Sequence, residues 1–417
     1  RVNSNGLIEP VGTLGADVIL NGDFEETGAD QILNGDFSQE SSEEVTNGDF
    51  ATDSNWTKGT GWTISGGTAN CDGTQTSSTA MVQETVTNSN ANVKVSFTIS
   101  GYVSGLIKVR NSGGFSGTYV SGNGTYVFYA NSGIATNIVL DADASFTGSI
   151  DNVSVVEVGQ DWDIINNAGS STTISDTLNI VTDGAYTQSS QNNVTIAGKT
   201  YKLQYTVLES DGGALGFIVT GNQTESIPST VGTHTHYFVS HSTSIIFKRA
   251  SGVLDITIDN ITVEEVGQEW FLSDGCSITA QGARITSDGT TQYIQQNNAL
   301  VIGDTYEMEY EITESVSGSV SVTNSFGSGL ALKNTVGVHK FYAVATNTFI
   351  QIKKSISPTD ITIDNIKIKR LNGDDTPRID YTDGGCPVLL TEPQSTNLIT
   401  DSNDFSAWNQ IQNVDLT

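Results

Sequence analysis

Short stretches of strictly alternating apolar and polar residues are the main pattern in this chain. In YKLQYTVLE, residues 201–209, the apolar side chains Tyr201, Leu203, Tyr205 and Val207 alternate with polar ones. Because successive side chains of a strand point to opposite faces, this period of two predicts a strand with one face against a core. Such runs recur along the sequence between turn residues. Long stretches in which apolar residues follow the period of an α-helix are absent from the sequence. The pattern therefore predicts an all-β fold of antiparallel sandwiches.

The alternating runs belong to a unit that is written three times. Three segments end alike, and their aspartates Asp151, Asp259 and Asp364 are 108 and 105 residues apart. The three endings are GSIDNVSVVEVGQDW, ITIDNITVEEVGQEW and ITIDNIKIKRLNGDD. Each is preceded by a related run (GTYVFYA, GTHTHYFV and GVHKFYAV) and, further upstream, by an alternating run (VKVSFTISG, YKLQYTVLE and YEMEYEITE). A fixed period of this kind predicts a repeated domain.

These repeats divide the chain into three β-sandwich modules and flanking segments. Module 1 is predicted at 45–158, module 2 at 159–267 and module 3 at 268–371. The flanking segments are an extended arm or connector at 1–16, a short tandem repeat at 17–44, a connector at 372–400 and the start of a further domain at 401–417.

The short repeat before module 1 contains Asn-Gly-Asp-Phe three times. The copies begin at Asn21, Asn34 and Asn47, a spacing of 13 residues, and only the third leads directly into a module. One interpretation is local duplication of a strand that opens a domain. Another is that three copies serve three modules, so that the two spare copies pair onto exposed sheet edges, within the chain or between subunits. The sequence leaves both open.

Composition and charge limit the classes of partner that this chain is expected to bind. The 417 residues include 47 acidic and 18 basic side chains, for a net charge of −29. Nucleic acid and anionic membrane surfaces bind clustered lysine and arginine, so neither is an expected partner. No apolar run approaches the roughly 20 residues of a membrane helix, and we predict no membrane insertion. The chain begins at Arg1 and stops within a pattern, so we expect a segment of a longer protein.

Catalytic and metal chemistry find little support in the residue pattern. His234 and His236 stand two residues apart on one predicted strand and could share a metal, but the repeats align them with Tyr126 and Phe128, which favours packing positions. The three cysteines lack zinc-ligand spacing and are expected to be free, small apolar residues. No nucleophile motif, phosphate-binding glycine loop or marked carboxylate pair is present. We therefore predict that the chain is not an enzyme.

Two resemblances bear on function. The opening TNGDF…W…GW, the central GTYVFYA and the closing IDNVSVVEV resemble the jelly-roll modules of galactose-binding and carbohydrate-binding domains. The phrases TPRIDYTDGGCPVLLTEPQSTNLITDSNDFSAW at 376–408 and RVNSNGLIEPV at 1–11 resemble a recurrent connector of bacteriophage tail and virion fibre proteins. The second resemblance implies a place on the virion surface, other virion proteins as partners, and a closed homo-oligomer, most often a trimer.

The carbohydrate-binding resemblance also implies candidate ligand residues. Sugar faces stack on aromatic rings while hydroxyl groups need hydrogen-bond partners, so exposed aromatic side chains are the candidates. In module 1 these are Trp56, Tyr102, Tyr119 and Tyr126. Trp56 stands in the polar stretch TDSNWTKGTG and is expected to be exposed. By contrast, the expected equivalents Trp62, Trp162 and Trp270 begin the three modules and are assigned to the core.

The same resemblance implies a structural calcium ion in module 1. Its expected ligands are Asp49, Asp151 and the nearby Asn47, because hard oxygen ligands suit Ca²⁺. Modules 2 and 3 lack their own NGDF and retain only Asp259 and Asp364 of this set. The competing interpretation is that Asp-Asn before a strand is ordinary turn chemistry.

Taken together, these patterns predict a non-enzymatic segment of a bacteriophage virion fibre or appendage that binds glycan on the host surface. One alternative is a purely structural spacer or decoration protein without a ligand. A second alternative is the glycan-binding region of a secreted bacterial glycan-degrading enzyme.

Overall fold

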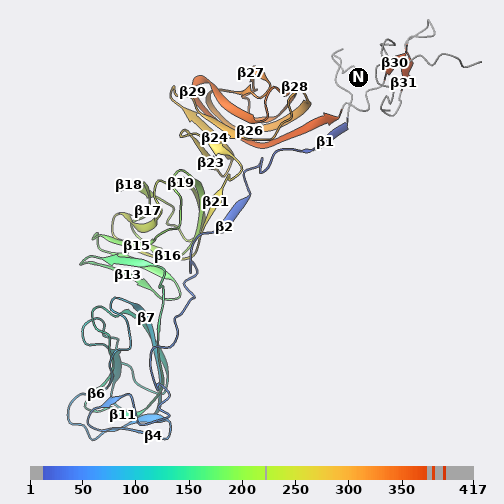
Figure 1. Ribbon diagram of the computed structural model, residues 1–417. Helices are drawn as coiled ribbons and strands as arrows, with labels where there is room; N and C mark the ends of the chain where they lie inside the picture. The colour runs from blue at the N-terminus through green and yellow to red at the C-terminus, as the bar shows by residue number, and fades with distance from the viewer. Residues whose placement is uncertain (1–12, 221–222, 373–377, 381–387, 391–417) are drawn as a thin grey trace, which may run out of the picture. The chain divides into compact units, whose positions relative to one another are not determined.

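The protein is described by a computed structural model that covers residues 13–220, 223–372, 378–380 and 388–390 (Figure 1). The regular secondary structure in these ranges consists of β strands, and the strand pairs are antiparallel. This confirms the predicted all-β fold. Within the same ranges no helix is long and apolar enough to cross a membrane. The phrase at 1–11, most of the predicted connector 372–400, the predicted domain 401–417 and Cys386 lie outside the described residues.

Two compact units divide the chain. One contains residues 25–268 and 277–280, and thus modules 1 and 2 with the second and third NGDF copies. The other contains residues 1–24, 269–276 and 281–417, and thus module 3 with the first NGDF copy. The segment 13–50, which we call the arm, therefore contributes to both units.

Module 1 is a sandwich of two antiparallel sheets. One sheet has the order β3-β6-β10-β8, and the other β4-β5-β11-β7-β9. The core between them includes Met81 and Leu140 from the first sheet and Phe97 and Ile150 from the second. The strands are β3 (Thr57–Lys58), β4 (Trp62–Ser65), β5 (Thr68–Asp72), β6 (Thr79–Gln83), β7 (Asn92–Ser104), β8 (Ile107–Arg110), β9 (Gly124–Asn131), β10 (Ile138–Ala142) and β11 (Thr147–Glu157).

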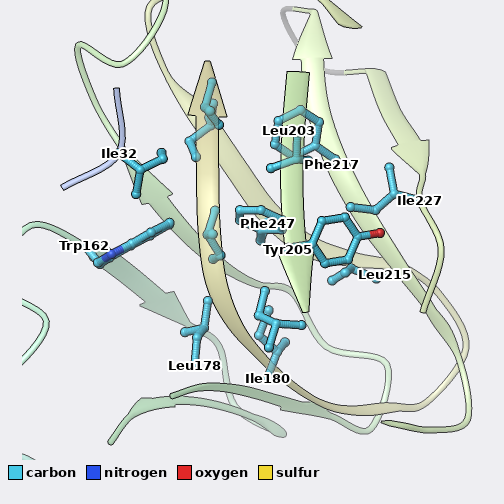
Figure 2. Close-up of a cluster of buried hydrophobic side chains, with 14 of the residues drawn as sticks. Ile32, Trp162, Leu178, Ile180, Leu203, Tyr205, Leu215, Phe217, Ile227 and Phe247 are labelled. Carbon is cyan, nitrogen blue, oxygen red and sulfur yellow. The ribbon is translucent and has the colours of Figure 1, made fainter. Parts of the chain in front are cut away.

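Module 2 repeats this arrangement with sheet orders β12-β15-β20-β17-β18 and β13-β14-β21-β16-β19. Figure 2 shows Leu203 and Tyr205 of one sheet meeting Phe217 and Phe247 of the other in the core. The strands are β12 (Asp163–Asn166), β13 (Ser170–Ile174), β14 (Leu178–Thr182), β15 (Thr187–Gln191), β16 (Thr200–Asp211), β17 (Ala214–Thr220), β18 (Gln223–Ser226), β19 (Gly232–Val239), β20 (Ile245–Ser251) and β21 (Leu254–Val266).

Module 3 is built around two long strands, β26 and β29, which Figure 1 shows as curved. β29 pairs with β25 through residues 350–353 and with β24 through residues 359–363, so one strand serves two successive parts of the sheet. The strands are β22 (Phe271–Leu272), β23 (Cys276–Thr279), β24 (Gly282–Ser287), β25 (Tyr293–Gln296), β26 (Thr305–Asn324), β27 (Gly327–Ala331), β28 (Gly337–Val344) and β29 (Ile350–Asn372). A separate pair, β30 (Arg378–Asp380) and β31 (Val388–Leu390), follows.

The repeated sequence runs form the same three strands in each module. The alternating run lies in β7, β16 and β26, and it pairs on one side with β9, β19 and β28, which carry the GTYVFYA-type run. On its other side it pairs with the closing strand, β11, β21 or β29. The sequence repeat is thus a structural repeat of one three-stranded core.

The NGDF copies pack on the modules in reverse order. The first copy, 21–24, packs on module 3, the second, 34–37, on module 2, and the third, 47–50, on module 1. Two arm strands, β1 (Thr13–Asp17) and β2 (Thr27–Asp30), pair with β29 and β21 (Figure 1). Of the two interpretations that the sequence left open, pairing of the spare copies onto module edges within the chain is therefore confirmed.

Each closing strand has one edge of which the module pairs only the first half, and the arm pairs with the second half. In module 2, β14 pairs with residues 254–258 of β21, and the arm pairs along residues 261–266. Modules 1 and 3 show the same division, because β5 and β24 pair with the first half of this edge and the arm with the second. Without the arm, the second half of each edge would expose unpaired backbone groups.

The cysteines that the structure describes are free and buried, as the sequence predicts. Cys71 is 3% exposed and Cys276 5% exposed. Burial raises the pKa of both thiols, that of Cys276 to about 11, although Ser273 and the Tyr293 backbone hydrogen bond to it. A buried thiol with a raised pKa is a poor nucleophile, so both residues act as small apolar core side chains.

Candidate functional site

Trp56, the favoured ligand candidate, is not exposed. Its side chain is 6% exposed and packs against Phe50, with ring centroids 5.4 Å apart. The indole N–H donates to the Asn47 carbonyl at 3.1 Å. The expectation of exposure was wrong because the polar stretch around Trp56 folds over the third NGDF copy. A ring enclosed in this way presents no face to a sugar.

The three tyrosine candidates differ in exposure. Tyr119 is 46% exposed, and the Lys108 ammonium lies 4.7 Å from its ring centroid. Tyr102 and Tyr126 are half-buried, and both hydroxyls donate to nearby backbone carbonyls. Their role in ligand binding stays a prediction, and Tyr119 presents the largest exposed aromatic surface of the three.

The tryptophan equivalence also needs correction. Trp56, Trp162 and Trp270 are the equivalent residues, because each donates its indole N–H to the asparagine carbonyl of an NGDF copy. Trp62 instead stacks on Phe146, with ring centroids 6.1 Å apart. All four are buried, as a core assignment requires for Trp62, Trp162 and Trp270.

The predicted calcium ligands of module 1 are engaged in turns. The Asn47 side chain donates to the carbonyls of Thr52 and Ser54, while one oxygen of Asp49 accepts from the backbone N–H of Ala51. Asp151 accepts from the N–H of Asn152. Within the described residues no group of three His, Cys, Asp or Glu side chains could hold a metal. Calcium at Asn47, Asp49 and Asp151 stays a prediction.

His234 and His236 do not converge on a common point of coordination. His234 Nε2 lies 2.5 Å from the Thr230 carbonyl, and His339 Nε2 makes the same contact to Thr335 at 2.6 Å. His236 packs between Phe217 and Phe238, with Glu225 3.3 Å away. Both histidines thus occupy packing positions of the repeat.

A cavity of about 800 Å³ lies where residues of module 1 and module 2 meet within one compact unit. Its lining is dominated by neutral amide side chains, with Asp163 as its one charged residue. The lining residues are Asn90, Asn92, Asn131, Trp162, Asp163, Ile164, Ile165, Asn166, Gln188, Ser190, Asn192, Ser244 and Ile246. Amides both donate and accept hydrogen bonds, so this surface suits a neutral ligand rich in hydroxyl groups.

Several of the cavity amides are held in place by neighbours. Asn192 donates to Asp163 at 2.8 Å and accepts from Ser244 at 2.7 Å. Asn131 donates to the Asn90 carbonyl at 3.0 Å. Ile165, 47% exposed, lies opposite Gln188 in the β12–β15 register and adds an apolar surface beside the amides. The predicted aromatic candidates do not line this cavity, and the sequence could not reveal it because its residues are scattered from 90 to 246.

A second site, repeated in each module, receives the arm, and we call it the arm site. It begins with an arm carboxylate that caps two backbone N–H groups, one in the arm and one in the closing strand. In module 2, Asp30 accepts from Ile32 at 3.0 Å and from Val263 at 2.9 Å. The equivalent contacts are Asp17 with Ile19 and Ile368, and Glu43 with Val45 and Val155, at 2.8–3.1 Å.

A buried glutamine of each module pairs with the arm residue that precedes the NGDF asparagine. Gln191 Oε1 accepts from the Leu33 N–H at 2.8 Å, and Gln191 Nε2 donates to the Leu33 carbonyl at 2.9 Å. The equivalent pairs are Gln296 with Leu20 and Gln83 with Thr46, at 2.8–3.0 Å. The glutamine therefore satisfies both backbone groups as a neighbouring strand would.

An aromatic pair closes the arm site. Trp162 donates to the Asn34 carbonyl at 3.2 Å, and its ring centroid lies 5.4 Å from that of Phe37. The equivalent pairs are Trp56 with Phe50 and Trp270 with Phe24. Figure 2 shows Ile32, from the arm, directed toward the module 2 core beside Trp162. The arm thus supplies core side chains that the modules lack.

The glycine of NGDF is required by close backbone contact. Gly35 accepts a hydrogen bond at 2.9 Å from the N–H of Ile261, and a Cβ at Gly35 would lie 2.0 Å from the Ile261 carbonyl oxygen. Gly22 and Gly48 meet Ile366 and Val153 in the same way, at 2.0 and 1.9 Å. No side chain fits at these distances.

The arm site of module 2 also brings two carboxylates near each other. Burial, together with the nearby charge of Asp36 in the arm, raises the pKa of Asp259. A raised carboxyl pKa in the folded state means that ionisation of Asp259 destabilises the fold at pH values above its normal pKa of about 4. Below that range the residue is protonated in both states and has no such effect.

We therefore predict that Asp259→Asn increases the stability of module 2 at pH 7. The asparagine retains an oxygen for the Asn260 N–H but carries no charge. The urea midpoint of module 2 should rise at pH 7 and match that of the unmodified chain at about pH 3, where Asp259 is neutral. Glu209→Gln, on the exposed end of β16, is the control. An equal gain at both pH values would show that charge is not the cause.

The arm-site glutamines were not identified from the sequence, although a signal was present. The triplet Gln-Asn-Asn occurs at 191–193 and again at 296–298, 105 residues apart, at the period of the modules. In module 1 the equivalent Gln83 is followed by Glu84 and Thr85, so the triplet is lost there.

Comparisons with known proteins assign the chain to no family. No protein-family model matches it, and no curated protein is similar to it in sequence. A solved structure with some likeness is the N-terminal CBM22-1-CBM22-2 tandem domain of Paenibacillus barcinonensis Xyn10C, at 9% identity and a TM-score of 0.22 over 55% of this chain and 98% of that one. Paenibacillus xanthan lyase is similar at 12% identity and a TM-score of 0.19, over 73% and 33%.

Proposed function

We propose that the chain is a non-enzymatic, glycan-binding segment of a bacteriophage virion appendage. The observation that carries the binding role is the amide-lined cavity at the meeting of modules 1 and 2. Its neutral donors and acceptors, beside the exposed Ile165, match the hydroxyl groups and C–H faces of an uncharged sugar. The strong negative charge of the chain also favours a neutral ligand over an acidic one.

The phage assignment is supported by the connector phrases at 1–11 and 376–408, which resemble those of virion fibre proteins. On this proposal the segment lies on the virion surface, contacts other virion proteins and acts as a homo-oligomer, with a trimer as the expected form. Weak binding at each cavity would then be multiplied by the number of copies that reach the host surface together.

A spacer without a ligand is the second candidate, and one observation favours it. The arm sites tie residues far apart in sequence into closed modules, which is a property expected of a mechanical element. A third reading, the binding region of a secreted glycan-degrading enzyme, would require a catalytic domain elsewhere in a longer protein.

A glycan array with the chain displayed in multiple copies tests the binding proposal. We expect binding to neutral glycans, and Gln188→Ala or Ile165→Ala should weaken it about 3- to 10-fold, since each removes an interaction of roughly 1 kcal/mol. Ile196→Ala, at a site 62% exposed in the same module but outside the cavity lining, is the matched control. Tyr119→Ala tests the remaining exposed aromatic candidate. Absence of binding to any glycan would favour the spacer.

A further inference from the structure

Two of the three arm sites do not depend on chain continuity. In module 1 the bonded residues Trp56 and Asn47 are only 9 positions apart. In module 2, Trp162 binds Asn34 across 128 positions, and in module 3, Trp270 binds Asn21 across 249 positions. The same contacts therefore form whether the NGDF segment is adjacent in sequence or distant. Modules 2 and 3 bind it as they would bind a separate peptide.

The three arm copies present the same groups in the same backbone conformation. The NGDF asparagines have φ of 47°, 50° and 58°, and the phenylalanines 56°, 53° and 48°. Positive φ is unusual for a residue as bulky as phenylalanine, and it recurs in all three copies, each of which also bonds the phenylalanine N–H to the asparagine carbonyl. The residue before the asparagine, Leu20, Leu33 or Thr46, differs between copies and points outward. The module glutamine binds the backbone of this residue, and its side chain lies outside the arm site.

Recognition at the arm site uses both backbone and side chains. Backbone pairing extends the half-open edge of the closing strand, which is the mode of strand addition known for peptide-binding domains. Selectivity comes from the carboxylate cap, the aliphatic residue two positions later, the glycine that must lack a Cβ, and the phenylalanine against tryptophan. The recognised pattern is therefore acidic-x-aliphatic-x-Asn-Gly-Asp-Phe, where x marks a position that differs between copies.

We propose that the arm sites of modules 2 and 3 are sequence-selective peptide-binding sites, and that the arm of a second copy of this chain occupies them, joining chains by exchange of arms. The occupant follows from the recognised pattern, which this chain itself carries three times. An arm that leaves its own module exposes an unpaired edge and an incomplete core, and only an equivalent arm restores both. This inference does not rest on glycan binding.

A labelled peptide tests the site in the full chain. The probe is a fluorescein-labelled peptide of residues 29–40, ADQILNGDFSQE. In a Gly35→Val chain the second NGDF copy cannot enter the arm site of module 2, so that site is open to the peptide. Fluorescence anisotropy should therefore give a dissociation constant at least about tenfold lower than for the unmodified chain, whose own arm competes with the peptide. A peptide carrying Gly35→Val should not bind, and a peptide of residues 16–27 from the first copy should bind about equally. A Leu33→Ser chain, altered at an exposed arm position, is the control.

Failure of the Gly35→Val chain to bind the peptide while its strand content is retained would overturn the proposal. So would equal binding of the Gly35→Val peptide. Should that chain not fold, exchange is tested with two cysteine variants in a Cys386→Ser background. Asp30→Cys and Glu264→Cys chains, whose positions are register partners, should form a disulfide-linked heterodimer when mixed. Leu33→Cys mixed with Glu264→Cys should not, and absence of the first heterodimer overturns exchange between chains.

Discussion

Phe37→Ala is expected to lower the free energy of unfolding of module 2 by about 3–5 kcal/mol, although Phe37 precedes the module by more than a hundred residues. The side chain is 1% exposed and belongs to the same core as Trp162 and Phe247. Its removal leaves a cavity against the tryptophan and loosens the arm strand that completes the β21 edge. Hydrogen exchange of the β16 and β21 amides measures the effect on this module alone.

Leu33→Ala is the matched control for Phe37→Ala. Leu33 lies in the same arm copy, is also a large apolar residue, and is 59% exposed. We expect a change within about 0.5 kcal/mol for this surface position. If both substitutions had equally small effects on exchange in β16 and β21, the arm would not be part of the module 2 core.

Gln296→Ala is expected to weaken attachment of the first arm copy to module 3 by about 1–3 kcal/mol. The glutamine is 5% exposed and makes two hydrogen bonds to the backbone of Leu20, at 3.0 and 2.9 Å. Alanine removes both, and each contributes about 0.5–1.5 kcal/mol. Protease cleavage of the arm near Leu20, followed by mass spectrometry, reports how often the arm detaches.

The adjacent residue supplies the control for Gln296→Ala. Gln295 points to the other face of β25, where its side chain donates to Asn297 at 2.8 Å and accepts from Gln351 at 2.7 Å. Gln295→Ala should leave cleavage near Leu20 unchanged within a factor of about two, because its side-chain hydrogen bonds are to Asn297 and Gln351 and not to the arm. Equal acceleration by both substitutions would mean that general weakening of β25, not loss of the glutamine contact, releases the arm.

Local pattern predicted the strands because alternation depends on residues close in sequence. The alternation in residues 201–209 is visible without tertiary information, and it forms β16 as expected. The repeated endings around Asp151, Asp259 and Asp364 likewise gave equivalent closing strands. The arm was harder, since the sequence showed three copies and three modules but not which copy meets which module.

The candidate sites were harder to predict because burial and convergence are set by distant residues. Trp56 lies in a polar stretch, yet Phe50 and the Asn47 carbonyl enclose it. Trp62 looked equivalent to Trp162 by its place at the start of a module, whereas hydrogen bonding to the arm identifies Trp56 instead. The cavity amides stand far apart in sequence, and nothing local marks Gln188 as their neighbour.

Disulfide trapping tests most directly whether the NGDF copies meet the modules in reverse order. Asp17 is the register partner of Lys369, and Asp30 that of Glu264. In a Cys386→Ser background, the matched double variants Asp17→Cys/Lys369→Cys and Asp30→Cys/Glu264→Cys should form intrachain disulfides in dilute solution. The crossed variants Asp17→Cys/Glu264→Cys and Asp30→Cys/Lys369→Cys lose the same carboxylate cap and should not. Efficient crosslinking of the crossed pairs, or of none, would contradict the reverse order.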